Sequence, residues 1–241
     1  MTRQIPWLRV FVEGVVIVGS ILLAFGIEAW WDERQERADE QLTLAALQVE
    51  FLGAKAELDY RRELHGRIEE GVKFTVAALQ GARHRNVSSI PLSHAVLALA
   101  YIPPTTQLSL GTLTGLIQSG QLGILQEPEL RTALSGWATF LDEMTEEETR
   151  ALDFVQSQLD PVLRSRVDVT PFVNMEFVRA FLDGTVSQVE AARESLVPAD
   201  LETMGVFAVR LSIIQHLLEE FPPLQNEVDR ILGLIEESLQ R

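Results

Sequence analysis

The stretch VFVEGVVIVGSILLAFGIEA, residues 10–29, decides the fold that the sequence predicts. About 20 helical residues cross the hydrocarbon core of a bilayer, which is about 30 Å thick. The uncharged run between Glu13 and Glu28 makes about 21 Å of helix. Both carboxylates would therefore lie near the edges of the apolar slab, where they can reach headgroups and water. We predict a transmembrane helix over residues 10–31.

Tryptophans stand on both sides of this stretch. Trp7 precedes it and Trp30–Trp31 follow it, as in the aromatic belts of spanning helices. Small residues within the stretch can let another membrane helix approach closely. They are Gly14, Gly19 and Gly26. We expect the lipid bilayer and other integral-membrane subunits as partners of this helix, and pigments or lipids only as contacts on its surface.

Two other interpretations of the apolar run stay open. Its length also fits the central region of a cleaved signal peptide, with Ala24-Phe25-Gly26 as the cleavage site. Glu13 at the start of the run and the two tryptophans after it argue against cleavage. A buried helix of a soluble protein would carry an apolar stripe, whereas this run is apolar all round.

The charges beside the span give its orientation. Arg3 and Arg9 precede it without an acidic residue, and Arg34 and Arg37 follow it, so the bias toward a cytoplasmic N-terminus is slight. We expect a bacterial inner-membrane protein with its N-terminus inside and its C-terminal domain in the periplasm. The expected parts are a short cytoplasmic tail (1–9), the transmembrane helix (10–31), a polar helical stalk (32–43) and an extracytoplasmic helical domain (44–241).

The composition limits the possible functions. The chain has 241 residues, with 35 Asp and Glu against 20 Lys and Arg, a net charge of −15 and no cysteine. An acidic exterior repels phosphate backbones, so we expect no nucleic-acid partner. It is also repelled by anionic lipid, which leaves the apolar helix as the attachment to the membrane. Thiol nucleophiles, iron–sulfur clusters and cysteine-based zinc sites are excluded.

Beyond the stalk, apolar residues recur every three or four positions, which predicts one buried face of a long helix. They are Leu44, Leu47, Phe51, Ala54, Leu58, Leu64, Ile68, Val72, Val76 and Leu79. Gly66 and Gly71 predict a bend in its second half. In the stalk, Glu33 and Arg37 have the spacing of an ion pair on one helix.

Later segments carry further helix signals. Ser89 can cap a short helix with Pro91 in its first turn, running to about Tyr101. Gly120 can take the left-handed conformation that ends a helix. Pro128 fits the first turn of the next helix, which we expect to run to about Leu141.

The second half of the chain also has recognisable helix boundaries. Thr145 and Glu148 form a capping box at the start of a predicted helix, and Pro161 is expected to kink that helix. A strongly periodic helix is expected from Asp200 to Glu220, and the pair Pro222–Pro223 is expected to interrupt it before a last helix from Leu224 to Leu239. No alternating run is long enough to predict a sheet. We predict an all-α fold, in which the membrane helix continues into a long helix packed in a bundle.

Two blocks of sequence carry a family resemblance. The first runs from Glu13 to Arg34 (EGVVIVG…LLA…IE…W…ER), and the second from Leu116 to Trp137 (LIQSGQL…L…PELR…L…W). Both are similar to segments of a widespread family of uncharacterised bacterial single-pass membrane proteins. The resemblance implies an N-terminal membrane helix, an all-helical extracytoplasmic domain and no known activity. The Pro222–Pro223 pair departs from the long terminal helix that this family leads one to expect.

Residues that could carry chemistry are scattered. None of the histidines (His65, His84, His94 and His216) has another at metal-ligand spacing. His65 and His216 each have a glutamate one turn later, which supplies too few metal ligands. We expect both on the surface or half-buried.

Glycines and acids between residues 111 and 148 have simple structural interpretations. Gly111, Gly115, Ser119 and Gly120 lack the Lys-Ser/Thr of a phosphate-binding loop, and we expect them to permit close helix packing. The acidic cluster of residues 142–148 could hold a hard cation, although helix capping explains it more simply. We therefore predict no catalytic, cofactor-binding or metal-ligating residues.

Three classes of function follow from these patterns. The first is a non-catalytic accessory or stabilising subunit of a larger integral-membrane complex, and a photosynthetic or other energy-converting assembly is the host to test first. The second is a membrane-anchored ligand-binding or sensor module, which requires an apolar pocket with a few convergent polar groups. An enzyme ranks last, because catalytic motifs are missing.

Overall fold

The computed structural model describes residues 7–102, 106, 108, 110–173, 175–182, 185 and 192–240; in 7–10, 12–15 and 175 it describes the backbone only. Most of the predicted cytoplasmic tail and the side chains of Trp7 and Glu13 lie outside this description. The elements are α1 (Trp7–His84), β1 (Ser89–Ser93), α2 (His94–Tyr101), α3 (Gly111–Ser119), a 3₁₀ turn η1 (Gln121–Ile124), α4 (Pro128–Phe154), a π-helical segment η2 (Val155–Leu159), α5 (Asp160–Arg164), α6 (Thr170–Val173), α7 (Met175–Leu182), β2 (Glu194–Pro198) and α9 (Leu201–Leu239).

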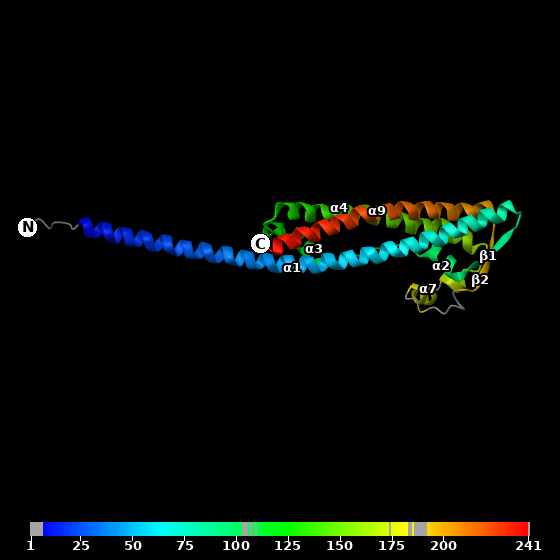
Figure 1. Cartoon of the computed structure of the whole chain (residues 1–241), viewed down its shortest axis with the longest axis horizontal. Coiled ribbons are helices and arrows are strands. Elements are labelled where there is room, and N and C mark those ends of the chain that lie inside the picture. Colours follow the sequence, from blue (N-terminus) through cyan, green and yellow to red (C-terminus); the bar gives the residue numbers. More distant parts are fainter. Residues whose placement is uncertain are drawn as a thin grey trace, which may run out of the picture.

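Helix α1 is the longest element and the axis of the molecule. It is a single helix of 78 residues, about 117 Å long at the usual rise per residue. Its N-terminal part projects beyond all other described elements, and its C-terminal part lies inside the bundle (Figure 1). The prediction that one helix continues through residues 32–43 into the domain is confirmed. The helix is also uninterrupted at Gly66 and Gly71.

The bundle is made mainly of α1, α4 and α9, with α9 antiparallel to α1. Polar contacts between α1 and α9 follow this arrangement, because higher numbers on α1 meet lower numbers on α9. The pairs are Lys55–Asp229 (2.5 Å), Asp59–Gln225 (2.5 Å), Arg62–Gln225 (3.1 Å) and Glu69–Gln215 (2.9 Å). Because these pairs are exposed, we assign the bundle's stability to its apolar interior.

Two apolar clusters fill the bundle, one toward the projecting helix and one toward the far end. The ten periodic residues predicted on α1, from Leu44 to Leu79, are all buried and divide between the two clusters. In the first cluster, Phe51 and Trp137 pack edge to face with ring centroids 5.4 Å apart. Gly71 lets α2 approach in the second cluster, because a Cβ there would lie 2.7 Å from Leu99 Cδ1.

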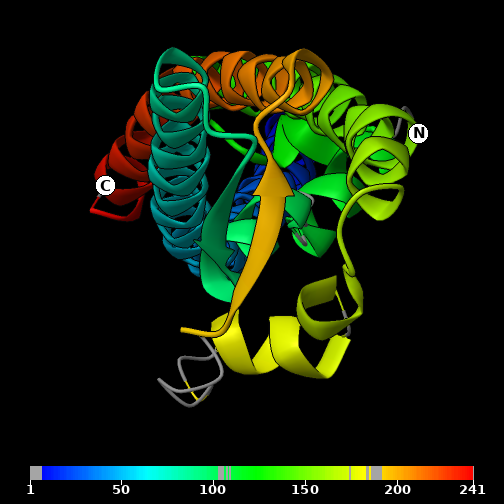
Figure 2. The same ribbon diagram turned by 90° about the vertical axis from the view of Figure 1, so that its right-hand side faces the viewer.

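A two-stranded antiparallel sheet lies across the far end of the bundle (Figure 2). Its strands are β1 and β2, and the prediction that Ser89 caps a helix is wrong. Ser93 caps α2 instead, with its Oγ accepting a hydrogen bond from Val96 N at 3.4 Å. A proline inside β1 and two adjacent apolar residues in β2 blur the alternation that would identify these short strands. Apart from this sheet, the all-α prediction is confirmed.

Two predicted helix boundaries are wrong. Thr145 lies inside α4, where its Oγ1 donates to Leu141 O at 2.7 Å, so its hydroxyl is satisfied without a cap. Pro222 and Pro223 lie inside α9, which continues past them. Both prolines are exposed, so water can reach the carbonyls that lose an N–H partner.

Other predicted boundaries are confirmed. Asp200 caps α9 by accepting from Thr203 N at 2.8 Å. Gly120 ends α3 in the left-handed conformation, with φ of 69°. Pro128 begins α4. Pro161 lies in the first turn of α5, directly after the π-helical segment η2, and the kink expected there stays a prediction.

One helix of the described chain is long and apolar enough to cross a membrane, and it is α9. The part of the span predicted over residues 10–31 whose side chains the structure describes does not meet the same criterion, so the predicted N-terminal topology is not supported. The side chains of α1 are described without a gap only from Val16 onward. A stretch long enough to cross a membrane that starts there includes three acidic residues, Glu28, Asp32 and Glu33.

Candidate functional site

The projecting part of α1 is an unusual surface for a folded chain. Its described large apolar side chains, from Phe11 to Trp31, are each 50–70% exposed. They are Phe11, Val16, Ile17, Val18, Ile21, Leu22, Leu23, Phe25, Ile27, Trp30 and Trp31. They surround the helix on every side, since no other described element lies alongside (Figure 1). A continuous apolar surface of this kind marks a contact with lipid or with another protein.

Aromatic and charged side chains mark the C-terminal boundary of this apolar surface. The rings of Trp30 and Trp31 have centroids 6.5 Å apart, and Arg34 lies over Trp30 at 5.8 Å. The predicted pair of Glu33 and Arg37 is present at 2.5 Å, with both side chains mostly exposed. Amphipathic aromatic rings next to cations are typical of the level of lipid headgroups.

Two carboxylates of α1 hold the bundle at its end nearest the projecting helix. Glu40 is 8% exposed and accepts from Gln126 N at 2.6 Å, just before α4. Glu50 accepts from Thr112 N at 2.6 Å, in the first turn of α3. A carboxylate at a helix N-terminus satisfies free N–H groups and complements the helix dipole. Together they fix the 111–127 segment against α1.

The residues predicted to permit close helix packing behave differently from one another. A Cβ at Gly111 would meet Glu50 Oε1 at 3.6 Å, an ordinary contact. Beyond its chain neighbours and its own helix backbone, no described atom lies within 4 Å of a Cβ at Gly115, so close packing at this glycine stays a prediction. Ser119 is exposed, and its hydroxyl donates to Gly115 O at 2.7 Å. Gly120 serves the helix end instead.

A buried cation lies in the half of the bundle away from the projecting helix. Arg210 of α9 is fully buried, and it donates from Nε to Ala100 O (3.2 Å) and from Nη2 to Ile102 O (2.9 Å). These carbonyls end α2, so the guanidinium caps that helix where its dipole is negative. Burial lowers the pKa of Arg210 to about 10. The side chain therefore stays charged at neutral pH.

His65 of α1 is the second unusual polar group in the interior. It is fully buried, so the prediction of a surface or half-buried position is wrong. Its ring packs edge to face on Phe221, with centroids 5.1 Å apart, and neither ring nitrogen has a hydrogen-bond partner among the described residues. Burial, followed by the charges of Arg210 and Arg61, lowers the pKa of His65 to about 3. The imidazole is neutral at physiological pH.

Glu148 of α4 is buried and also binds backbone. Its carboxylate accepts from Thr106 N at 2.9 Å and from Thr106 Oγ1 at 2.5 Å. Burial raises the pKa of Glu148, and the hydrogen bonds from Thr106 oppose this change. The acidic cluster around it does not cap a helix as predicted, because it lies inside α4. Two of its members, Glu146 and Glu147, pair with Arg150 on the surface.

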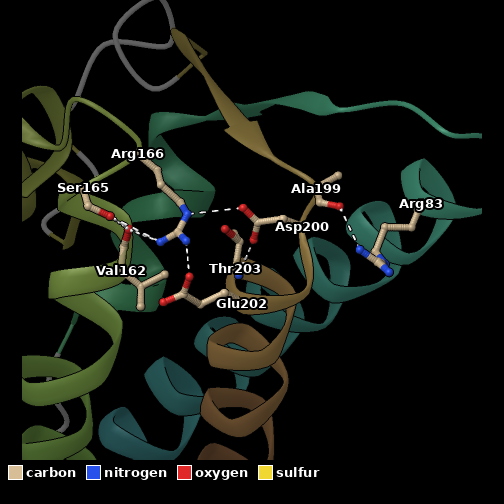
Figure 3. Close-up of polar contacts among 8 residues, drawn as sticks. All are labelled: Arg83, Val162, Ser165, Arg166, Ala199, Asp200, Glu202 and Thr203. Carbon is tan, nitrogen blue, oxygen red and sulfur yellow. Dashed lines mark hydrogen bonds and ion pairs between the residues drawn. The ribbon is translucent and has the colours of Figure 1, made fainter.

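A surface cluster fastens the far end of the bundle (Figure 3). Arg166, which follows α5, reaches Asp200 with its Nε 3.3 Å from Oδ2, and it also pairs with Glu202. Asp200 is at the same time the cap of α9. On the other side, Arg83 Nη1 donates to Ala199 O at 3.5 Å. The cluster ties the start of α9 to α1 and to the segment after α5.

Apart from His65, these polar groups share one role: each binds the chain's own backbone or a neighbouring side chain. The described residues contain no group of three His, Asp or Glu arranged to hold a metal ion. An open pocket of about 360 Å³ lies beside α5 and α6. Its lining consists of Arg164, Val167, Asp168, Val169, Thr170 and Val173. These groups hold segments of the chain in place. Most of them bind the chain between the end of α2 and the start of α4.

Sequence reasoning missed the buried polar groups that organise the bundle. Arg210 could have been found, because it interrupts the apolar face of α9 between Phe207 and Ile214. Glu40 and Glu50 carry no such signal, since an acidic residue on a polar stalk or helix normally faces water. Comparison of the chain with protein-family models, with curated proteins and with solved structures finds no match.

Proposed function

We propose that this chain is a non-catalytic accessory subunit of an integral-membrane complex, anchored by residues 10–31 of α1. The observation that carries the proposal is the exposed apolar surface from Phe11 to Trp31. Leaving so many large apolar side chains in water costs about 25 cal/mol for each Å². Lipid or a neighbouring membrane helix removes that cost.

Helix α9 has a different assignment in this proposal, although its composition would allow it to cross a membrane. It supplies both apolar clusters, with Phe207, Ile214, Phe221 and Val228 all fully buried. It also carries Arg210, which is bonded to the end of α2. Moving α9 into lipid would open both clusters and leave a charge without its carbonyl partners. We therefore assign α9 to the bundle.

The dimensions of α1 fit this topology. Trp30, Trp31 and Arg34 would lie at the headgroups, with Glu28 near the edge of the apolar slab. The exposed residues between Arg34 and Glu40 then form a stalk of roughly 8 Å before the bundle begins. With the N-terminus in the cytoplasm, the bundle stands on the periplasmic face of the inner membrane. A surface of net negative charge keeps the bundle away from anionic lipid.

The positions of the polar groups support the proposed accessory role. The carboxylates of Glu40, Glu50 and Glu148 and the guanidinium of Arg210 are used to hold the chain's own backbone. Space is open beside Gly19 and Gly26, where another membrane helix can approach. We propose other integral-membrane subunits as partners, with a photosynthetic or other energy-converting assembly as the first host to test.

Membrane extraction tests the anchor. Native membranes would be washed with alkaline carbonate, and the full-length protein measured in pellet and supernatant. We expect wild type in the pellet and the double variant Ile21→Arg/Leu22→Arg in the supernatant or degraded, because two central charges oppose insertion. Phe74→Arg is the matched control, because Phe74 is 60% exposed on the same helix but inside the bundle region. Wild type released by carbonate would refute the anchor.

Purification in mild detergent tests the accessory role. Stoichiometric membrane subunits that co-migrate with the wild type, and that are lost from an anchor-disrupted variant, are the expected result. The second candidate function, a ligand-binding module, would instead yield a protein without other subunits that retains a small molecule. In that case the small molecule would occupy the open pocket at α5 and α6.

A further inference from the structure

The outer face of α1 carries a second apolar stripe, distinct from the buried one. We call it the outer stripe, and its members are Ala38, Leu42, Ala45, Val49, Leu52 and Ala56. All six are exposed, with Leu42, Val49 and Leu52 at 72, 71 and 53%. Their spacing alternates between four and three residues, which is the period of a two-helix coiled coil. No described part of the chain covers them.

We propose that the outer stripe pairs with the same stripe of a second copy of this chain, as a parallel coiled coil over residues 31–56. Leu42 and Val49 take positions a, with Ala45 and Leu52 at positions d. The bundle contacts Leu47 and Phe51 on the opposite side of the helix. Two copies can therefore meet along α1 with their bundles pointing outward.

Charge patterning favours a second copy in parallel register. In a parallel pair, a residue at position g faces the residue five places later, at position e, of the other helix. Arg34 occupies g and Asp39 occupies e, so each copy offers a cation to the carboxylate of its partner. The later g positions, Gln41 and Gln48, bring no like charges together. Gln35, a polar residue at position a, can fix the register.

Beyond the outer stripe, the same side of α1 carries acidic residues, and these residues set the end of the interface. Asp59, Glu63 and Glu70 continue the four-and-three spacing and are exposed. Identical positions face each other in a parallel pair, so these residues would oppose their own copies. The helices are therefore expected to separate after Ala56, leaving the far halves of the two bundles apart.

The parallel direction rests on the proposed function, because two chains anchored in one membrane present α1 the same way up. Without cysteine in the sequence, single cysteines can report the contact directly. Leu42→Cys and Leu52→Cys would be expressed separately in full-length protein and oxidised with copper phenanthroline in native membranes. Leu42 and Leu52 lie about 15 Å apart along the helix. An antiparallel pair cannot bring both positions against their own copies.

We expect disulfide-linked dimers from both variants. Three control positions should give little dimer: Glu63→Cys and Glu70→Cys among the acidic residues beyond the outer stripe, and Glu33→Cys on the other side of the stalk. Adding Val49→Asp to Leu52→Cys should lower the dimer yield at least about tenfold, the effect of about 1.4 kcal/mol, because it places facing carboxylates in the seam. Phe74→Asp, away from the stripe, should leave the yield unchanged.

Dimers of equal yield at all positions, or linkage only to a different protein, would overturn the coiled coil. Its failure is separable from failure of the anchor. A chain recovered from the soluble fraction but cross-linked with the same position dependence would refute the anchor alone. A membrane-bound chain without dimers at Leu42 and Leu52 would refute the coiled coil alone.

Discussion

Replacing His65 with leucine should remove the pH dependence that this residue gives to the free energy of unfolding. His65 is fully buried against Phe221 and lies near the charges of Arg210 and Arg61. Its pKa falls from 6.5 to about 3 in the folded chain. Between pH 6.5 and pH 3, the unfolded chain therefore binds a proton at His65 that the folded chain does not bind. The stability that depends on neutral His65 is complete above pH 6.5 and is lost as the pH falls toward 3.

The size of the effect follows from that window. A pH of 5 is about 1.5 units below the pKa of histidine in the unfolded chain, and each unit is worth about 1.36 kcal/mol of unfolding free energy. The wild type should lose about 2 kcal/mol between pH 7.5 and pH 5 through this residue. His65→Leu should lose none of it. At pH 7.5 the variant should match the wild type within about 1 kcal/mol, because leucine removes two unpaired ring nitrogens and keeps apolar packing.

The assay is chemical unfolding of full-length protein in detergent, followed by circular dichroism at both pH values. The quantity compared is the change in unfolding free energy between pH 7.5 and pH 5, wild type minus variant. Burial also lowers the pKa of His94, and subtraction cancels its contribution because both proteins contain it. Identical pH dependence in the two proteins would show that His65 is accessible to protons in the folded state, and would refute the reasoning.

Three further predictions concern stability at neutral pH, measured by the same unfolding assay. Arg210→Met should cost about 3 kcal/mol, because two carbonyls at the end of α2 lose hydrogen bonds from a cation; a change below about 1 kcal/mol would contradict the cap. Phe51→Ala should cost about 3–5 kcal/mol, whereas Phe74→Ala, on an exposed side chain, should stay within about 0.5 kcal/mol. Gly66→Ala should stabilise by about 1 kcal/mol, and Gly71→Ala should gain less because a leucine of α2 must move; equal gains would contradict that contact.

Much of the fold could be predicted because it depends on local patterns. The stripe from Leu44 to Leu79 has helical period, and a period of that length leaves one orientation toward the core. Asp200 starts α9 with a side chain that accepts a hydrogen bond, and Gly120 terminates α3 with a left-handed backbone. Such signals need no knowledge of distant residues.

The errors arose where distant residues decide the outcome. Ser89 belongs to a strand because a segment about a hundred residues later pairs with it. Pro222 and Pro223 do not end α9, because Phe221 and Leu224 beside them are held in the core. Local preference is a weak prior that packing overrides.

The buried polar groups were harder still to predict. Glu40, Glu50 and Glu148 each bind a backbone N–H far away in the sequence. An acidic side chain looks the same in the sequence whether it faces water or a helix end. His65 was expected nearer the surface for the same reason, since charged residues stand two places before and two places after it in the sequence, while its contact is Phe221 of α9.

We propose that α1, and not α9, lies in lipid, and cysteine labelling tests this assignment most directly. Ile21→Cys and Val209→Cys replace side chains of similar exposure, 50 and 48%, on the two helices. Native membranes carrying each variant would be treated with a water-soluble maleimide, with and without detergent. We predict that the cysteine at position 21 reacts only after detergent is added, whereas that at position 209 reacts at once. Rapid labelling at position 21 together with protection at position 209 would assign the membrane to α9 and contradict the account.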